Sequence, residues 1–209
     1  MKEEKNHSSP LQSWLIWSSG GLFFLLGFFH RVAPAVLHRE LTVDFSLSAS
    51  SLGALTSLYY YSYTAMQIPT GLLADLWGPR RLLAFGLIST AISSAFFAIS
   101  EELFWARVAR FLIGGSVAVA FVTTLKLSSH WLPPKRYAFA TGMLLVAGMT
   151  GAVFAGYFLH QATILFGWRN VTLASALLAL LMAVLLFIFV RDDSSEKGLK
   201  SYLDKESSG

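Results

Sequence analysis

Six long runs of apolar residues, separated by short polar breaks, constrain what this chain can fold into more than any other feature. A helix that crosses the hydrocarbon core of a membrane needs about 20 mostly apolar residues. The runs of this kind cover residues 14–37, 52–73, 82–99, 104–127, 138–166 and 171–190. Only 13% of the residues are charged, whereas an average soluble domain has about 25%. The sequence therefore predicts an all-α integral membrane protein built as a bundle of six transmembrane helices.

The breaks between the runs divide the chain. They contain turn residues such as the Gly78-Pro79 pair. The breaks at Glu101 and at Gly167 are so short that the helices on either side are expected to be antiparallel neighbours. We expect a polar tail over residues 1–13, the helical bundle over 14–191, and a second tail or interdomain linker over 192–209.

Basic residues gather on one side of the predicted bundle. With the amino end inside, eleven of the 16 Lys and Arg residues fall on the cytoplasmic side and three in the outer loops. Because cytoplasmic loops carry the excess of basic residues, we expect both ends in the cytoplasm and the chain in the plasma membrane, the inner membrane of a bacterium. The basic residues are spread over several loops, which argues against nucleic-acid binding despite the net charge of +4.

Motifs for catalysis, metals and cofactors are not found in this sequence. Cysteine is absent, which excludes thiolate metal ligands and cysteine nucleophiles. The sequence has no phosphate-binding glycine loop, no histidine-based metal motif and no serine elbow. We expect neither an enzyme nor a metal or cofactor site.

Two arginines fall inside the predicted spans. Arg31 lies about two-thirds of the way along the first run, and Arg110 lies about a turn inside the fourth. An arginine near the centre of a membrane helix costs ~2.5 kcal/mol or more, so it normally faces a protein interior or a water-filled cavity. A guanidinium offers a planar fork to a carboxylate or phosphate, which favours Arg31 as a binding group for an anion. Alternatively, Arg31 extends to the lipid headgroups, as we expect of Lys126.

Four further residues complete the candidate solute pathway. Tyr60, Tyr63 and Gln67 share one face of the second predicted helix, and aromatic walls with hydroxyl and amide groups suit a cavity for a polar solute. The alternative is a belt of tyrosines at the headgroups, which fits Tyr60 better than the deeper Tyr63 and Gln67. Histidine is the side chain whose ordinary pKa is close to neutral, which makes His30 a candidate for proton coupling, although a lone helix histidine is more often a packing residue.

Small residues recur along the fifth run. Gly148, Ala152 and Gly156 follow at four-residue steps, with Gly151 alongside. Small residues at this spacing let another helix approach closely, so the pattern predicts helix packing rather than chemistry.

The break after the second run contains the most specific motif of the chain. It reads Gly71-Leu72-Leu73-Ala74-Asp75-Leu76-Trp77-Gly78-Pro79-Arg80-Arg81. This resembles the signature loop of the major facilitator superfamily, written G-x-L-A-D-R-x-G-R/K-R/K, and it lies where that family has it. Arg110, followed four residues later by Gly114, resembles a weaker pattern of the family's fourth helix. The resemblance extends over residues 14–191.

This resemblance implies an architecture. Members of the family normally have twelve helices in two halves, each a pair of inverted three-helix repeats, with the solute bound between the halves. By resemblance, this chain corresponds to the amino-terminal half and stops in what would be the interdomain linker. A loop that gates the conformational change would comprise Gly71, Asp75, Gly78, Arg80 and Arg81.

The same loop has a physical interpretation. Gly71 and Gly78 are expected to allow a close helix approach and a tight reversal. In the family the aspartate contacts a helix of the other half, so Asp75 is expected to need a partner from another chain. Leu76 and Pro79 replace basic residues of the motif, which thins its charge network. The fifth run also lacks the Gly-Pro pair typical of the family's antiporters, which favours symport or uniport.

The resemblance finally implies a function. It is that of a secondary transporter, or half of one, that moves a small polar solute by alternating access, and Arg31 favours an anionic or carboxylate-bearing solute. The expected partners are the lipid bilayer, the solute and a second six-helix half, either a second copy or a separate chain. The alternative is a truncated or split six-helix membrane protein that does not transport and serves as an interaction or regulatory subunit.

Overall fold

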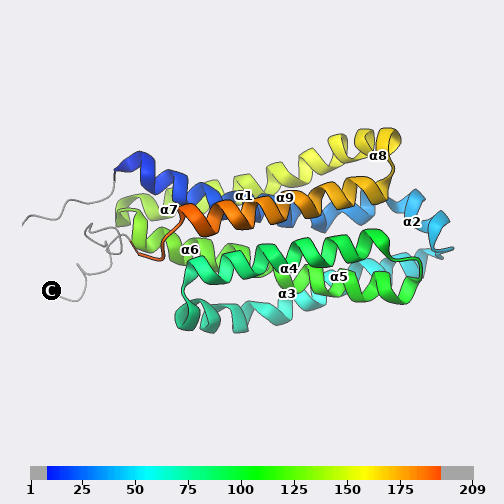
Figure 1. Ribbon diagram of the computed structural model, residues 1–209, viewed down its shortest axis with the longest axis horizontal. Coiled ribbons are helices and arrows are strands. Elements are labelled where there is room, and N and C mark those ends of the chain that lie inside the picture. The colour runs from blue at the N-terminus through cyan, green and yellow to red at the C-terminus, as the bar shows by residue number, and fades with distance from the viewer. Residues whose placement is uncertain (1–8, 194–209) are drawn as a thin grey trace, which may run out of the picture.

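The computed structural model describes residues 9–193, and within this part of the chain every regular element is a helix. The long helices run side by side along one axis, and both ends of the described chain lie at the same end of the bundle (Figure 1). Four of the long helices are uninterrupted: α1 (Pro10–Val36), α3 (Ala49–Trp77), α4 (Pro79–Ile99) and α9 (Trp168–Phe189). Two further segments contain an irregularity: α5 (Leu103–Val117) continues as α6 (Val119–Trp131), and α7 (Pro134–Phe154) continues through the π-helical turn Ala155–Leu159 as α8 (His160–Phe166).

Each of the six predicted runs is found as a helical segment, with ends shifted by a few residues. α1 begins at Pro10 rather than at residue 14, because the Ser9 side chain caps it by accepting a hydrogen bond from the backbone N–H of Gln12 (3.3 Å). The break after the first run holds a short helix that the sequence did not predict, α2 (His38–Asp44). The short break at Glu101 does join antiparallel neighbours, α4 and α5 (Figure 1).

Five of the six segments are long and apolar enough to cross a membrane. The sixth, α3, has 29 residues, but it falls short of the same apolar criterion. Its middle, residues 56–67, carries four tyrosines together with Ser, Thr and Gln side chains. The chain is therefore a multi-pass membrane protein in which α3 is the segment least suited to face lipid.

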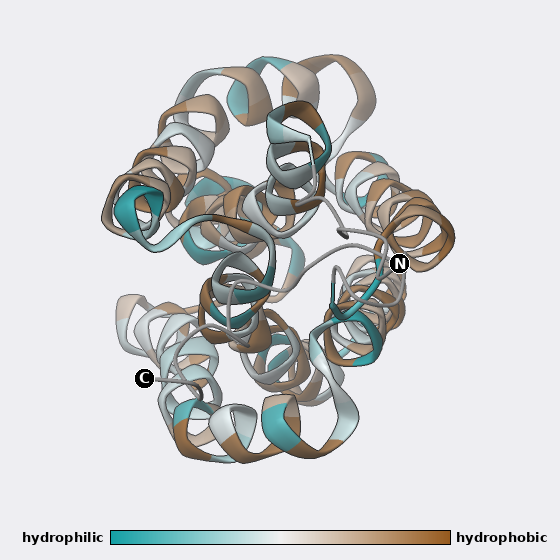
Figure 2. Cartoon of the chain, turned by 90° about the vertical axis from the view of Figure 1, so that its left-hand side faces the viewer, coloured by the Kyte–Doolittle hydropathy of each residue, from teal (hydrophilic) through white to brown (hydrophobic). Residues whose placement is uncertain are grey.

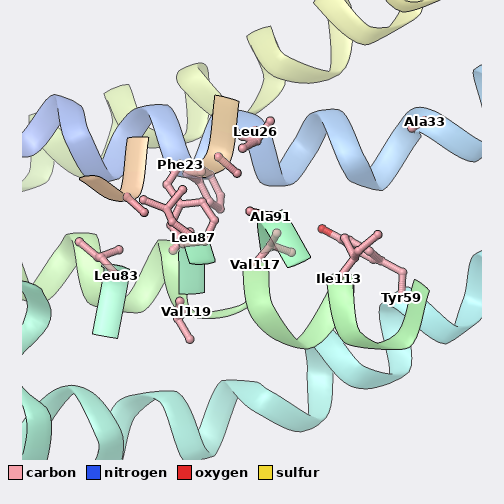
Figure 3. Packing of buried hydrophobic residues seen from close by; sticks show 14 of the residues in the cluster. Phe23, Leu26, Ala33, Tyr59, Leu83, Leu87, Ala91, Ile113, Val117 and Val119 are labelled. Carbon is pink, nitrogen blue, oxygen red and sulfur yellow. The ribbon is translucent and has the colours of Figure 1, made fainter. Parts of the chain in front are cut away.

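α1, α4 and α5 meet in an apolar core. Phe23 and Leu26 of α1 pack with Leu87 of α4, beside Val117 and Val119 at the junction of α5 and α6 (Figure 3). Seen along the bundle axis, hydrophobic residues predominate along the helices (Figure 2). The core holds the helices that carry the candidate site at fixed positions relative to one another.

Two glycines mark the closest helix crossings. A Cβ atom at Gly114 of α5 would lie 2.2 Å from the carbonyl oxygen of Tyr59 in α3. One at Gly151 of α7 would lie 2.3 Å from the carbonyl oxygen of Leu25 in α1. A Cβ atom at Gly148 would also lie 2.7 Å from the ring of Phe24 in α1. The predicted packing role is therefore confirmed for Gly148 and Gly151, whereas within the described chain nothing lies within 4 Å of such an atom at Gly156.

Polar contacts tie together the end of the bundle that carries α2. The carboxylate of Asp44 accepts a hydrogen bond from the indole N–H of Trp168 (2.8 Å) and pairs with Arg169 (3.4 Å). Arg169 also donates to the carbonyl oxygens of Ala98 and Ser100 at 2.8 and 2.7 Å. Because these residues come from α2, α9 and the end of α4, the contacts join three segments that are remote in sequence.

Candidate functional site

Arg31 of α1 lies in a cluster of aromatic rings. Its guanidinium carbon is 4.3 Å from the ring centre of Phe28, 4.7 Å from Tyr63, 5.8 Å from Tyr59 and 5.9 Å from Tyr60. We call these four residues the aromatic cluster. The Arg31 side chain is half-buried, and its Nε atom is buried without a hydrogen-bond partner. Arg31 is thus surrounded by aromatic rings, and the faces of such rings attract a cation.

Tyr59 is the centre of the cluster, although the sequence pointed to Tyr60, Tyr63 and Gln67. The ring of Tyr59 is fully buried and stacks on Tyr63 at 6.0 Å. Its hydroxyl reaches toward α1 and donates to the carbonyl oxygen of Gly27 at 3.0 Å (Figure 3). Tyr60 is 44% exposed. Gln67 lies one turn further along α3 and donates to the carbonyl oxygen of Tyr63 at 3.4 Å.

Arg110 of α5 lies behind the cluster and is 1% exposed. Its Nη1 atom donates to the carbonyl oxygen of His30 at 2.9 Å, and its guanidinium carbon is 5.1 Å from the ring centre of Tyr59. Its Nε and Nη2 atoms are buried without a hydrogen-bond partner. The structure therefore brings both predicted arginines to one tyrosine ring, but it leaves only Arg31 accessible.

His30 is packed inside the bundle. Its side chain is 3% exposed, and Nε2 lies 3.4 Å from the hydroxyl of Ser94 in α4. Its ring also stands edge-on to Phe29 at 5.5 Å. These surroundings agree with the packing interpretation of this residue.

No carboxylate within residues 9–193 neutralises either arginine. The contacts between basic and acidic side chains in this part of the chain lie toward the two ends of the bundle: the ion pairs Lys126–Asp75 and Arg169–Asp44, and the contact of His130 with Asp193. A buried charge normally requires a partner, because its desolvation is costly. The membrane-embedded region described here therefore has an excess of positive charge.

The predicted gating loop lies at the opposite end of the bundle from α2. Asp75 is in the last turn of α3 and forms an ion pair with Lys126 of α6, which also donates to the carbonyl oxygen of Ala74 at 2.8 Å. A lysine of its own chain thus reaches Asp75, whose side chain is still 70% exposed, and the expected contact with another chain stays a prediction. For the same reason Lys126 does not simply extend to the headgroups.

The two glycines of the loop differ. Gly78 has φ +81° and separates α3 from α4, so the predicted tight reversal is confirmed. The predicted close approach at Gly71 is wrong for the described chain, since a Cβ atom there would meet nothing within 4 Å. Arg80 donates from Nε to the carbonyl oxygen of Phe187 (3.1 Å) near the end of α9, whereas Arg81 is exposed.

The sequence interpretation missed a second polar contact at this end. Asp192 accepts a hydrogen bond from the backbone N–H of Arg80 at 2.6 Å, which places a carboxylate at the amino terminus of α4. His130 lies 2.8 Å from Asp193, and the indole N–H of Trp131 donates to the carbonyl oxygen of Arg191 at 3.1 Å. The available signal was the acidic pair Asp192-Asp193 directly after the sixth run, which the predicted topology places on the same side of the membrane as the loop.

Comparison with known proteins agrees with the fold and the loop. The family model described as Major Facilitator Superfamily matches residues 16–207. The uncharacterized transporter YybO of Bacillus subtilis is 26% identical over 99% of this chain and 48% of its own length. The probable sulfoacetate transporter SauU of Cupriavidus necator is 24% identical over 82% of this chain and 40% of its own length. The chain thus spans about half the length of these curated relatives.

A solved structure shows the same arrangement of helices. The inward-facing, unoccupied crystal structure of a bacterial homolog of the human lysosomal transporter Spinster has a TM-score of 0.80 and 22% identity, covering 89% of this chain and 44% of that one. At this identity the likeness concerns the fold. Since the family model covers most of the sequence and the helices follow the same path, the chain belongs to the Major Facilitator Superfamily.

Proposed function

We propose that this chain forms one six-helix half of a secondary active transporter that moves a small anionic, carboxylate- or sulfonate-bearing solute by alternating access. The observation that carries the proposal is Arg31: a half-buried guanidinium at membrane depth, held by aromatic rings and unpaired with any described carboxylate. An intramembrane arginine of this kind faces a pathway or a partner, because lipid cannot solvate it. Its planar donors match a carboxylate or sulfonate group.

The name of one relative supports the class of solute. SauU is described as a probable sulfoacetate transporter, and sulfoacetate carries both a sulfonate and a carboxylate. A site whose unpaired charge is an arginine favours such an anion over an uncharged sugar.

A second six-helix half would complete the site. α3 exposes the polar side chains of Tyr60 and Tyr61, and α8 exposes His160 and Gln161. A face that carries polar groups at membrane depth suits protein or water better than lipid. We place this second half, either another copy or a separate chain, against α3 and α7–α8. The basic loops favour a plasma membrane orientation with both ends in the cytoplasm.

Uptake by variants of Arg31 tests the proposal. In vesicles that contain this chain and the half that completes it, we expect Arg31→Gln to lower sulfoacetate uptake by about tenfold or more, because a desolvated charge contact is lost. Arg31→Lys keeps the charge but loses the planar fork, so its uptake should lie between that of the unmodified chain and that of Arg31→Gln.

Arg39→Gln provides the matched control, since Arg39 is an exposed arginine of α2 outside the cluster. Its uptake should equal that of the unmodified chain, and an uncharged sugar should not compete. If Arg31→Gln takes up sulfoacetate at the unmodified rate, the proposal is wrong. If no variant or control transports, the alternative of an interaction subunit is favoured.

A further inference from the structure

Pro34 interrupts the hydrogen bonding of α1 beside the candidate site. A proline has no backbone N–H, so the carbonyl group four residues earlier loses its helical partner. In α1 that carbonyl belongs to His30, which directly precedes Arg31. An unpaired carbonyl within a membrane is costly in free energy unless another donor reaches it.

Arg110 of α5 is the donor that reaches this carbonyl. Its Nη1 atom lies 2.9 Å from the His30 oxygen, across a separation of 80 residues in sequence. The second proline within a described transmembrane helix, Pro69 of α3, offers a comparison. It frees the carbonyl of Ala65, an exposed residue to which no side chain of the described chain donates. Only the break in α1 is thus filled by a charged side chain.

The other nitrogen atoms of Arg110 do not face a space for a solute. Nε and Nη2 are buried without a partner. The void beside them, lined among others by His30, Thr172 and Ser175, measures about 10 Å³. A space of this size holds a water-sized group. A solute with a carboxylate is too large for it, so in this conformation only Arg31 is open to such a solute.

We propose that Arg110 is a positioning residue for the anion site and not a ligand of the solute. Its guanidinium replaces the hydrogen bond that Pro34 removes from His30, and this contact fixes the stretch of α1 that carries Arg31. The assignment of a solute to Arg31 rests on the proposed function, whereas the link between Arg110 and the proline break does not.

A double-mutant cycle tests the link. Arg110→Met keeps an extended side chain but has no donor, and we expect it to lower the melting temperature of the purified chain by about 5 °C. In Pro34→Ala the restored backbone N–H pairs with the His30 carbonyl within the helix. Added to that background, Arg110→Met should lower the melting temperature by less than half as much. Arg110→Lys retains one donor group, so it should lower the melting temperature less than Arg110→Met does.

Pro69→Ala is the matched control, because it restores a backbone N–H far from Arg110. It should leave the loss caused by Arg110→Met unchanged. The link is overturned if Arg110→Met lowers the melting temperature equally with Pro34 and with Pro34→Ala. It is also overturned if Pro69→Ala reduces the effect of Arg110→Met as much as Pro34→Ala does.

Uptake kinetics distinguish positioning from general stability. In folded protein, Arg110→Met should raise the KM for sulfoacetate about tenfold with an unchanged maximal rate, and Pro34→Ala should bring the KM back toward the unmodified value. An unchanged KM contradicts the positioning role. If Arg31→Gln leaves uptake unchanged while the melting temperatures still show that Arg110 and Pro34 are coupled, only the proposed function is contradicted.

Discussion

Tyr59 connects the two arginines of the site. Its ring centre lies 5.8 Å from the guanidinium carbon of Arg31 and 5.1 Å from that of Arg110. Its hydroxyl is committed to the carbonyl oxygen of Gly27, one turn before Arg31. A single buried side chain thus links α3 to the backbone of α1 and presents ring faces to charges on α1 and α5.

Removing that hydroxyl tests how much it contributes. Tyr59→Phe should lower the free energy of unfolding by about 1 kcal/mol, because one buried hydrogen bond is lost while the ring remains. Denaturation of the purified chain in detergent measures this change. Tyr61→Phe is the control, because Tyr61 is 68% exposed and should show no loss. Equal stabilities of the two variants would mean that the contact with Gly27 contributes nothing.

Part of this residue-scale arrangement could be predicted from the sequence. The residues Arg31, Tyr60 and Tyr63 were selected from depth and spacing, and the structure places both tyrosine rings beside the Arg31 guanidinium. Gln67 lies one turn further along α3, and a role of any of them in a solute pathway stays a prediction. Tyr59 was not selected, because helical spacing does not distinguish it from Tyr60: Tyr63 follows Tyr59 by four residues and Tyr60 by three, and both spacings share a helix face. The contact of α3 with Gly114 decides which tyrosine is buried, and that contact depends on the tertiary fold.

At the scale of elements, the crossing of α3 and α5 sets the geometry of the site. Gly114→Ala would place a Cβ atom 2.2 Å from the carbonyl oxygen of Tyr59. We expect the two helices to be forced apart, at a cost of about 1–3 kcal/mol in unfolding free energy. Denaturation of the purified variant in detergent measures this loss of unfolding free energy.

Gly142→Ala in α7 is the matched control for that change. Nothing lies within 4 Å of a Cβ atom at this position, so the added methyl group has room. Alanine is also the better helix former, and stability should stay the same or rise. A similar loss in both variants would show that the tight crossing at Gly114 is not the cause.

The ends of the elements were harder to predict than their middles. Apolar runs locate a membrane helix because the hydrocarbon core demands them. The partners of loop side chains come from distant segments, as with Asp75 and Lys126 or with Asp192 and the amino terminus of α4. No spacing along the sequence specifies such pairs, so the contact of Asp75 with Lys126 could not be predicted.

At the scale of the whole molecule, the bundle has two kinds of exposed surface. α9 exposes a continuous apolar side that suits lipid: Leu177, Leu178, Leu181, Val184, Leu185, Ile188. α3 and α8 expose apolar side chains too, but tyrosine, histidine and glutamine side chains lie among them. The fold and family followed from hydropathy and one loop motif. The residues that would line the opposite side of a solute site cannot be predicted from this sequence, because the chain covers about half the length of its relatives.

Thiol labelling tests whether the aromatic cluster around Arg31 is a water-accessible anion site. The chain has no cysteine, so Thr64→Cys, at an exposed position one turn from Tyr60, creates a single reactive thiol. In membranes, we expect a charged thiol reagent to modify it, sulfoacetate to slow the modification, and Arg31→Gln to abolish that protection. A thiol that stays unmodified, or that sulfoacetate protects equally well without Arg31, would contradict the account.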